Sequence, residues 1–302
     1  MTQSRGDVIL VTGATGRVGR LVVDELLHAG ASVRALTRRL EHAALPAGVE
    51  VVAGDLSNPA SLDSALDGAV TVFLVWTAAP ATAPAVVARL AAQPRRVVYL
   101  SSPHQTPHPF FQQPNPMRDL HVEIERLLAA ASVDVTVLRP GMFASNALHW
   151  WAPQIRDGDV VRWPYADAET APVDVRDIAA AAARTLIDRH HAGGDYVLTG
   201  PESLSQAAQV HAIGDAIGRQ LRFDELSPDE FRRETTGIWP SGVAEMLLGA
   251  WRATLGRPAF VTSAVQEILG SPPRTFYQWA ADHASAFAHP RAGPDAPRVN
   301  DR

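Results

Sequence analysis

The sequence predicts an α/β fold, a doubly wound parallel sheet with a smaller, mostly helical C-terminal part. Short β-branched runs alternate with Ala- and Leu-rich stretches of helical period through about the first two hundred residues. The runs are continuously apolar, as in strands that helices cover on both faces. A glycine-rich stretch directly follows the first run. The length of 302 residues suits one such unit with an appended part.

The first half of the chain holds the expected strands and the helices that join them. We predict strands at residues 8–12, 32–36, 49–53, 70–75, 96–101 and 134–139. We predict helices at residues 20–29, 59–66, 84–92 and 120–131. Ser57 or Asn58 is expected to cap the second helix, with Pro59 in its first turn.

The second half has a different pattern. A Trp- and Pro-rich segment, "NALHWWAPQIRDGDVVRWPY", precedes a short strand and a helix at residues 178–188. Late helices are expected at residues 205–217, 228–236, 241–254, 261–269 and 275–287. We expect this half to pack as a small lid on the strand ends.

Composition excludes several classes of function. The net charge is −5 with interspersed acids and bases, so no basic stripe is available for nucleic acid. The chain has no cysteine, which excludes disulfides and thiolate metal sites. No apolar run approaches the ~20 residues of a membrane span. We expect a cytoplasmic protein without a nucleic-acid or membrane partner, and its oligomeric state is left open.

The glycine-rich stretch "ILVTGATGRVG" is typical of a dinucleotide-binding loop. Gly13 would permit the tight turn, Gly16 would let the backbone approach a pyrophosphate, and Gly19 would let the helix pack close to the strand. The N-terminus of that helix would direct unpaired N–H groups at the anion. The expected cofactor contacts here are Gly13, Thr15, Gly16, Arg17, Val18 and Gly19.

The end of the second strand indicates which dinucleotide binds. "SVRALTRRL" places Arg38 and Arg39 where an acidic residue would bind the ribose of NAD, and no acid occurs before Glu41. Arginine can bind the 2′-phosphate of NADP by bidentate hydrogen bonds, and Arg17 could add a second fork. We therefore predict NADP(H) in preference to NAD(H). The alternative is that both arginines are solvated loop residues.

Several segments together resemble one family. "VTGATGRVG", "VRALTRR", "VVAGDL", "VVYLSS", "HVEIERLL…VTVLRPGMFASN" and "APVDVRDIAAAAA" resemble the NmrA-like branch of the atypical short-chain dehydrogenases/reductases, in order over residues 8–287. The resemblance implies a Rossmann sheet, with Asp55 and Leu56 near the adenine. It also implies that the nicotinamide half is lined by Val75, Trp76, Thr77, Ser101, Pro140, Gly141 and Phe143.

On this basis the chain is divided into three parts. We expect an NADP-binding core at residues 1–145 and a substrate-binding lid at 146–290, of which 171–200 return to the core. Residues 291–302, which are polar and rich in Pro and Gly, are expected to be disordered.

The proton-donating machinery of most short-chain reductases is absent. In the shared frame the usual Lys falls on His121 and the usual Tyr on Met117, and methionine cannot donate a proton. An acceptor such as a quinone or an enone would not need a tyrosine as proton donor, because the cofactor supplies the hydride and the proton can come from water. The candidate catalytic residues are His121, at the start of its helix, and Ser102.

Histidine and aromatic residues provide candidates for substrate binding. We expect contacts from His104, Phe110 and Phe111 in a loop over the cofactor, and from Asn146, His149 and Trp150. Trp150 and Trp151 could instead pack the lid onto the core. His104 and His108 have metal-pair spacing, but the intervening prolines prevent a helix, so no metal site is predicted.

These observations favour an NADPH-dependent oxidoreductase acting on a small hydrophobic, aromatic or quinone-like acceptor. Two alternatives remain open. The missing Tyr and Lys also suit a non-redox isomerase or cyclase of secondary metabolism, and the fold also suits a dinucleotide sensor that works through a protein partner.

Overall fold

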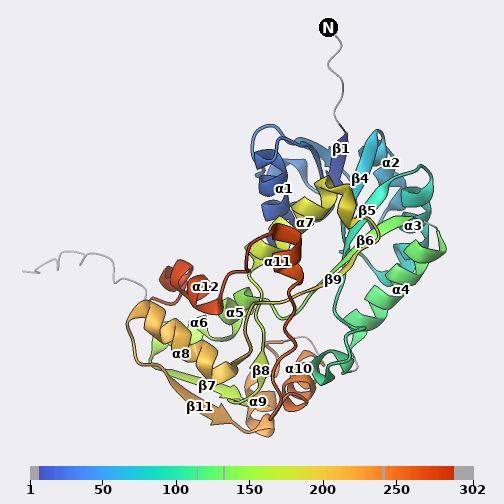
Figure 1. Ribbon diagram of the computed structural model, residues 1–302. Helices are drawn as coiled ribbons and strands as arrows, with labels where there is room; N and C mark the ends of the chain where they lie inside the picture. The colour runs from blue at the N-terminus through green and yellow to red at the C-terminus, as the bar shows by residue number, and fades with distance from the viewer. Residues whose placement is uncertain (1–6, 114, 132, 240–241, 289–302) are drawn as a thin grey trace, which may run out of the picture.

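The computed structural model describes residues 7–113, 115–131, 133–239 and 242–288 (Figure 1). The tail at 291–302, expected to be disordered, lies outside these ranges, as does residue 241 at the start of an expected helix. Within the described ranges, no helix has the length and apolar character needed to cross a membrane.

The centre of the molecule is a seven-stranded sheet in which every strand pairs in parallel. Its order is β3-β2-β1-β4-β5-β6-β9, which confirms the predicted doubly wound fold. The strands are β1 (Val8–Val11), β2 (Ser32–Thr37), β3 (Glu50–Ala53), β4 (Ala69–Val75), β5 (Arg96–Leu100), β6 (Asp134–Pro140) and β9 (Asp195–Leu198). Strand β9 was not among the expected strands.

Helices cover both faces of this sheet (Figure 1). One face packs against α1 (Arg17–His28), α7 (Val175–Ile187) and α11 (Ala264–Leu269), so α11 belongs to the core and not to the lid. The other face packs against α2 (Asp63–Leu66), α3 (Ala83–Ala91) and α4 (Pro116–Ala130). The apolar side chains on both faces explain why the strands lack alternating polar residues.

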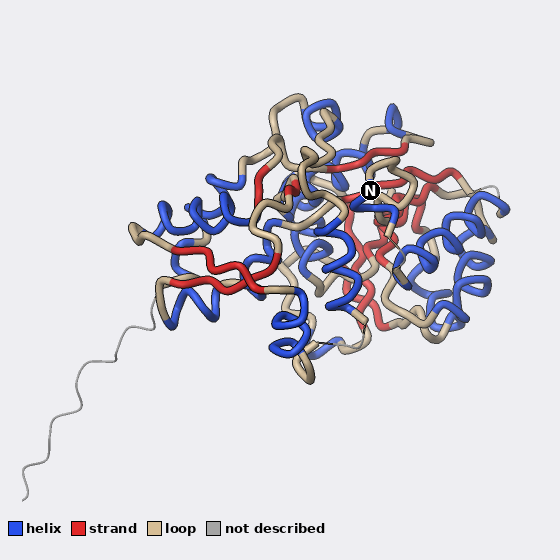
Figure 2. Tube along the Cα trace, turned by 90° about the horizontal axis from the view of Figure 1, so that it is seen from below, coloured by secondary structure: helices blue, strands red, loops and turns tan. Residues whose placement is uncertain are grey.

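The lid has its own apolar core, built around tryptophan. Trp151, Trp163 and Trp251 are buried there and contact one another through their rings. Figure 2 shows the short lid strands apart from the main sheet. The lid contains α5 (Ala147–Trp150), α6 (Ala152–Asp157), β7 (Val160–Pro164), β8 (Glu169–Thr170), β10 (Leu204–Ser205), α8 (Gln206–Ile217), β11 (Arg222–Leu226), α9 (Pro228–Thr235), α10 (Val243–Arg252) and α12 (Phe276–Asp282). Strand β11 pairs in parallel with β7, and β10 pairs antiparallel with β8.

Several helix boundaries differ from the expected ones. Helix α1 begins at Arg17, three residues early, and α4 begins four residues early because the Asn115 side chain accepts hydrogen bonds from the N–H groups of Met117 and Arg118. The expected helix at 59–66 is a 3₁₀ turn (Pro59–Leu62) followed by α2, and the side chain of Asn58 does not cap it. Helices α10, α11 and α12 are shorter than expected. Other 3₁₀ turns are Leu40–His42, Pro80–Thr82, Pro109–Gln112, Ala144–Asn146, Arg189–His191 and Ala284–Ala286.

Candidate functional site

The turn between β1 and α1 has the geometry of an anion-binding loop. Gly13 has φ +61°, a conformation that favours glycine, and its carbonyl accepts a hydrogen bond from Gly16 N at 2.9 Å. A Cβ on Gly19 would lie 2.2 Å from the same carbonyl oxygen, so only glycine lets α1 pack this close. Gly16 is the N-cap of α1 and provides no side-chain cap, so the first N–H groups of the helix are available to a pyrophosphate.

This loop lies where the strand order reverses, between β1 and β4. Thr12 joins the carboxyl ends of the two strands, since its Oγ1 accepts from Val75 N at 2.8 Å and donates to Phe73 O at 3.1 Å. Dinucleotides bind outside the carboxyl ends of strands at such a switch point. A dinucleotide held here would extend one half over β2 and the other half toward β5 and β6.

The arginines expected at the ribose phosphate have different surroundings. Arg38 and Arg39 follow β2, are exposed, and form no side-chain ion pair or hydrogen bond with any residue of the described ranges. Arg17 instead reaches the lid, where Nη1 donates to Ser145 Oγ at 3.1 Å and Nη2 lies 3.2 Å from His149 Nε2. Arg17 therefore connects the glycine loop to the lid in this structure.

Some side chains expected near the cofactor are buried in the core. Val18, Leu56 and Trp76 belong to the apolar clusters, and Trp76 Nε1 donates to Ala78 O at 2.7 Å. If these residues contact the cofactor as predicted, their backbone groups make most of that contact. Thr15 and Thr77 are exposed beside the strand ends. The Asp55 carboxylate accepts a hydrogen bond from Ser57 N at 2.8 Å and shapes the turn after β3.

A cleft of about 360 Å³ opens at the carboxyl ends of β5 and β6, between the core and the lid helix α10. Pro140 and Gly141 lie at its base, and Ser102, His104 and Asn146 also line it. Most of the remaining wall is apolar, as in sites for small organic ligands. This wall includes Phe110, Phe111, Met142, Phe143, Met246 and Leu247.

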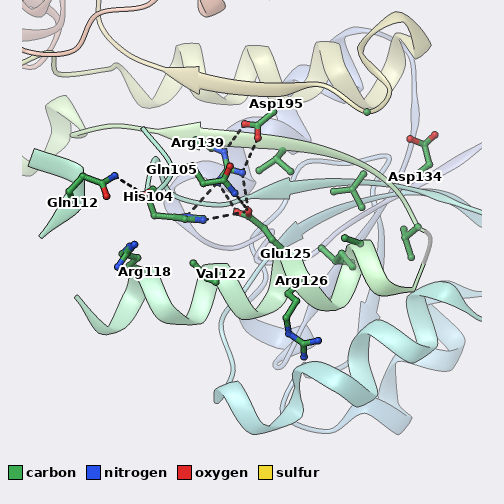
Figure 3. Close-up of a pocket in the computed structure, with 16 residues that line it drawn as sticks. His104, Gln105, Gln112, Arg118, Val122, Glu125, Arg126, Asp134, Arg139 and Asp195 are labelled. Carbon is green, nitrogen blue, oxygen red and sulfur yellow. Dashed lines mark hydrogen bonds and ion pairs between the residues drawn. The ribbon is translucent and has the colours of Figure 1, made fainter. Parts of the chain in front are cut away.

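A buried charge network holds His104 at the edge of this cleft, and Figure 3 shows the network from a neighbouring cavity that His104 also lines. His104 Nδ1 lies 3.3 Å from Ser102 Oγ, and its Nε2 lies 3.5 Å from Glu125 Oε2. The guanidinium of Arg139 binds both oxygens of Glu125, at 2.7 and 2.9 Å, and also binds Asp195. Burial lowers the pKa of His104, and the Glu125 carboxylate opposes this shift. The network orients the imidazole toward Ser102.

Two adjacent serines at the end of β5 point in different directions. Ser101 is buried, and its hydroxyl donates to Glu125 Oε1, so its side chain belongs to the charge network and not to the cofactor side. This corrects the expected role of Ser101. Ser102 is the serine that lines the cleft.

His121 lies away from the cleft. It is in the second turn of α4 and not at the helix start, and its Nδ1 lies 2.7 Å from the hydroxyl of Tyr99, a residue of the buried core. It is not among the described residues that line the cleft. Burial lowers the pKa of His121 to about 4, so the imidazole is neutral at pH 7.

The burial of His121 predicts a loss of stability in acid. The unfolded chain binds a proton on this residue below about pH 6.5, whereas the folded chain does so only near pH 4, so the free energy of unfolding falls as the pH drops through this window. The loss from this residue is at most about 3 kcal/mol. Urea denaturation of wild-type and His121→Asn protein at pH 7.5 and 4.5 measures it. A pH dependence that persists unchanged in the variant contradicts the prediction, and the exposed His211→Asn is the control.

The three substrate-binding residues predicted in the lid have different surroundings. Asn146 lines the cleft, whereas His149 is exposed and contacts Arg17. Trp150 packs in the lid core, with its ring stacked on Trp163 at 5.7 Å, and does not line the cleft as the structure describes it. Trp150 and Trp151 are therefore packing residues, but they pack within the lid and do not join it to the core as the alternative expected.

A second, larger cavity of about 940 Å³ lies between α4 and β6. It shares His104 and Arg118 with the cleft and extends along β6 to Asp134 and Val135, at the amino end of the strand and so at the opposite end of the sheet from the glycine loop. Since dinucleotide enzymes bind their substrates at the carboxyl ends, we assign the site to the smaller cleft.

Some residues that line the cleft were not predicted from the sequence. Asn115 and Arg118 come from the start of α4, and Ala250 comes from α10 together with the two apolar residues already named. Arg118 and Glu125 are seven residues apart on one helix, a spacing that puts them on one face and could have indicated the first group.

Comparisons with known proteins agree with this fold. The model of the NmrA-like family matches residues 5–254. A (4-alkanoyl-5-oxo-2,5-dihydrofuran-3-yl)methyl phosphate reductase of Streptomyces griseus is 41% identical over 285 residues, covering 93% of this chain and 99% of the relative. An NAD(P)H azoreductase of Xenophilus azovorans is 32% identical over 298 residues, with the same coverage.

A solved structure also matches over nearly the whole chain. The NADPH complex of the NADPH-dependent quinone oxidoreductase of Escherichia coli superposes with a TM-score of 0.77 at 26% identity, covering 92% of this chain and 98% of that chain. Together with the family match, the extent of these similarities shows that the chain belongs to the NmrA-like family.

Proposed function

We propose that this protein is an NADPH-dependent reductase of a small, largely apolar acceptor with an activated double bond, of the unsaturated lactone class. The observation that carries the proposal is the apolar cleft at the carboxyl ends of β5 and β6, the same end of the sheet as the glycine loop, with Ser102 and His104 at its edge. The 41% identical relative is named for reduction of a dihydrofuranone, and the other two are named for azo and quinone reduction.

In the proposed mechanism, the residues of the glycine loop bind the cofactor, and those of the cleft bind the acceptor and polarise its carbonyl group. When bound, the nicotinamide supplies a hydride to the β-carbon of the acceptor. The Phe110 and Phe111 side chains cover the apolar part of the acceptor and exclude water from it. The Ser102 hydroxyl donates a hydrogen bond to the acceptor carbonyl, where negative charge develops, and His104, whose Nδ1 lies 3.3 Å from Ser102 Oγ, holds the hydroxyl in place.

The proton balance of this reduction requires no Tyr and Lys pair. Hydride addition leaves an enolate on the acceptor, and a proton from solvent then adds at the α-carbon. The reduction of one C=C bond therefore consumes one reduced cofactor and one proton. Ser102 stabilises the enolate oxygen in the proposed mechanism, and Glu125 and Arg139 act as positioning residues through His104.

The preference for NADPH over NADH is the second part of the proposal, and it depends on the free arginines after β2. Arg38→Ala should weaken NADPH binding by about 10-fold or more and leave NADH binding unchanged, because only NADPH carries the 2′-phosphate. Nicotinamide fluorescence titrations with both cofactors measure this effect. Arg184→Ala on α7, which removes a surface arginine paired with Asp188, is the matched control. Equal losses for both cofactors would contradict the preference.

Isotope transfer tests the reduction itself. NADPH carrying deuterium at C4 is supplied with an alkanoyl-dihydrofuranone methyl phosphate, and the product is analysed by mass spectrometry and NMR. We expect deuterium at the carbon β to the ring carbonyl. A product without deuterium would overturn the proposal in favour of a non-redox isomerase or cyclase, and cofactor binding with no turnover of lactone, azo or quinone acceptors would favour the sensor.

A further inference from the structure

Arg118 is an unpaired cation at an otherwise apolar cleft. It comes from the first turn of α4 and lines the cleft together with Asn115. Its Nε is buried and has no hydrogen-bond partner, and its guanidinium forms no ion pair within the described ranges. Figure 3 shows Arg118 on the side of α4 that faces His104, with no interaction drawn to any neighbour. A buried donor without a partner costs stability, which indicates a partner that binds from outside.

The acidic group nearest to the cleft among the described residues is already paired with another arginine. Glu125 is occupied by both Nη atoms of Arg139, and no Asp or Glu is among the described residues that line the cleft. The N-terminus of α4, fifteen residues long, begins directly after Asn115, so its dipole adds positive potential at the same place. The cleft therefore has a local excess of positive charge at one end and apolar walls elsewhere.

We propose that Arg118 is the anchor of an anionic acceptor and binds a phosphate monoester at the α4 end of the cleft. This inference rests on the proposed reductase function, whose substrate class it narrows to phosphorylated acceptors. The guanidinium matches two phosphate oxygens in a bidentate arrangement, and the desolvated Nε gains the partner that it lacks. The apolar part of the acceptor then lies toward Phe110 and Phe111, and its carbonyl lies toward Ser102.

Binding of phenyl phosphate tests the anchor without turnover. The protein is loaded with NADP⁺, so that the cofactor phosphate sites are filled, and titrated calorimetrically with phenyl phosphate and with phenol. Arg118→Met should weaken phenyl phosphate binding by about 10- to 100-fold, and Arg118→Lys, which keeps a point charge, should weaken it less. Arg126→Met is the matched control, since Arg126 is on the same helix, pairs with Glu123, and points away from His104 in Figure 3.

Steady-state kinetics place the anion in the cleft. The paired substrates are the alkanoyl-dihydrofuranone methyl phosphate and the corresponding alcohol without the phosphate. Arg118→Met should raise KM for the phosphate ester by the same factor of about 10 to 100 and leave kcat/KM for the alcohol nearly unchanged. No phenyl phosphate binding by the wild type, or equal losses in Arg118→Met and Arg126→Met, would overturn the inference. Phenyl phosphate binding through Arg118 without lactone reduction would uphold it while overturning the proposed function.

Discussion

Replacing Ser102 with alanine should lower kcat for an unsaturated lactone by about 100-fold, the usual effect of removing one hydrogen-bond donor from a developing oxyanion. The hydroxyl lines the cleft and lies 3.3 Å from His104 Nδ1, so it is held where an acceptor carbonyl would bind. Because the donor acts on the transition state, KM for the acceptor and the Kd for NADPH should change little. Stopped-flow measurement of NADPH oxidation under single-turnover conditions gives the rate of the hydride step.

The neighbouring serine provides the control for this prediction. Ser101→Ala removes a hydrogen bond to Glu125 and leaves the cleft wall intact, so it should lower the thermal midpoint while the hydride step slows only a few-fold. Equal slowing in both serine variants would show that the rate depends on the buried network and not on the Ser102 hydroxyl.

Replacing Gly19 with alanine should nearly abolish dinucleotide binding. The added Cβ would lie 2.2 Å from Gly13 O, so either α1 moves away from β1 or the turn at Gly13 changes, and both movements displace the N–H groups that face the pyrophosphate. We expect NADPH affinity to fall by about 100-fold or more. We also expect the free energy of unfolding to fall by about 2 kcal/mol, as for other overpacked positions.

Gly158→Ala is the matched control, because Gly158 has extended backbone and an added Cβ meets nothing within 4 Å. Fluorescence titration with NADPH and thermal unfolding report the two effects separately. If Gly19→Ala bound NADPH as tightly as Gly158→Ala does, the close approach of α1 would not be required for the cofactor site.

The turn between β1 and α1 and most strands of the main sheet could be predicted from local sequence. The spacing of Gly13, Gly16 and Gly19 predicts the β1–α1 turn because each position depends on backbone freedom within a few residues. Six of the seven main strands are also readable, since a strand covered on both faces needs a continuous apolar run. The alternation of strands and helices then allows few topologies, because parallel crossovers are right-handed.

Contacts between segments distant in the sequence were not predictable in this way. Ser101 and Ser102 are adjacent residues of the same type, so the sequence does not distinguish their roles. Only the position of Glu125, 24 residues after Ser101, shows that the Ser101 hydroxyl is the one that donates a hydrogen bond within the buried network. His121 is a plausible acid in the sequence, but the packing of α4 against β5 places it beside Tyr99 and lowers its pKa. A side chain's role depends on what is packed around it, and this is a property of the tertiary structure.

The sequence by itself determined the class of fold and the glycine loop, because period, apolar runs and glycine spacing are local properties of the chain. The tertiary structure alone decided the cleft: it brought the start of α4 beside the lid helix α10 and left the buried Nε of Arg118 without a partner among the described residues. The physical reason is that burial and charge pairing are sums over neighbours, and those neighbours come from segments as far apart as residues 102 and 250.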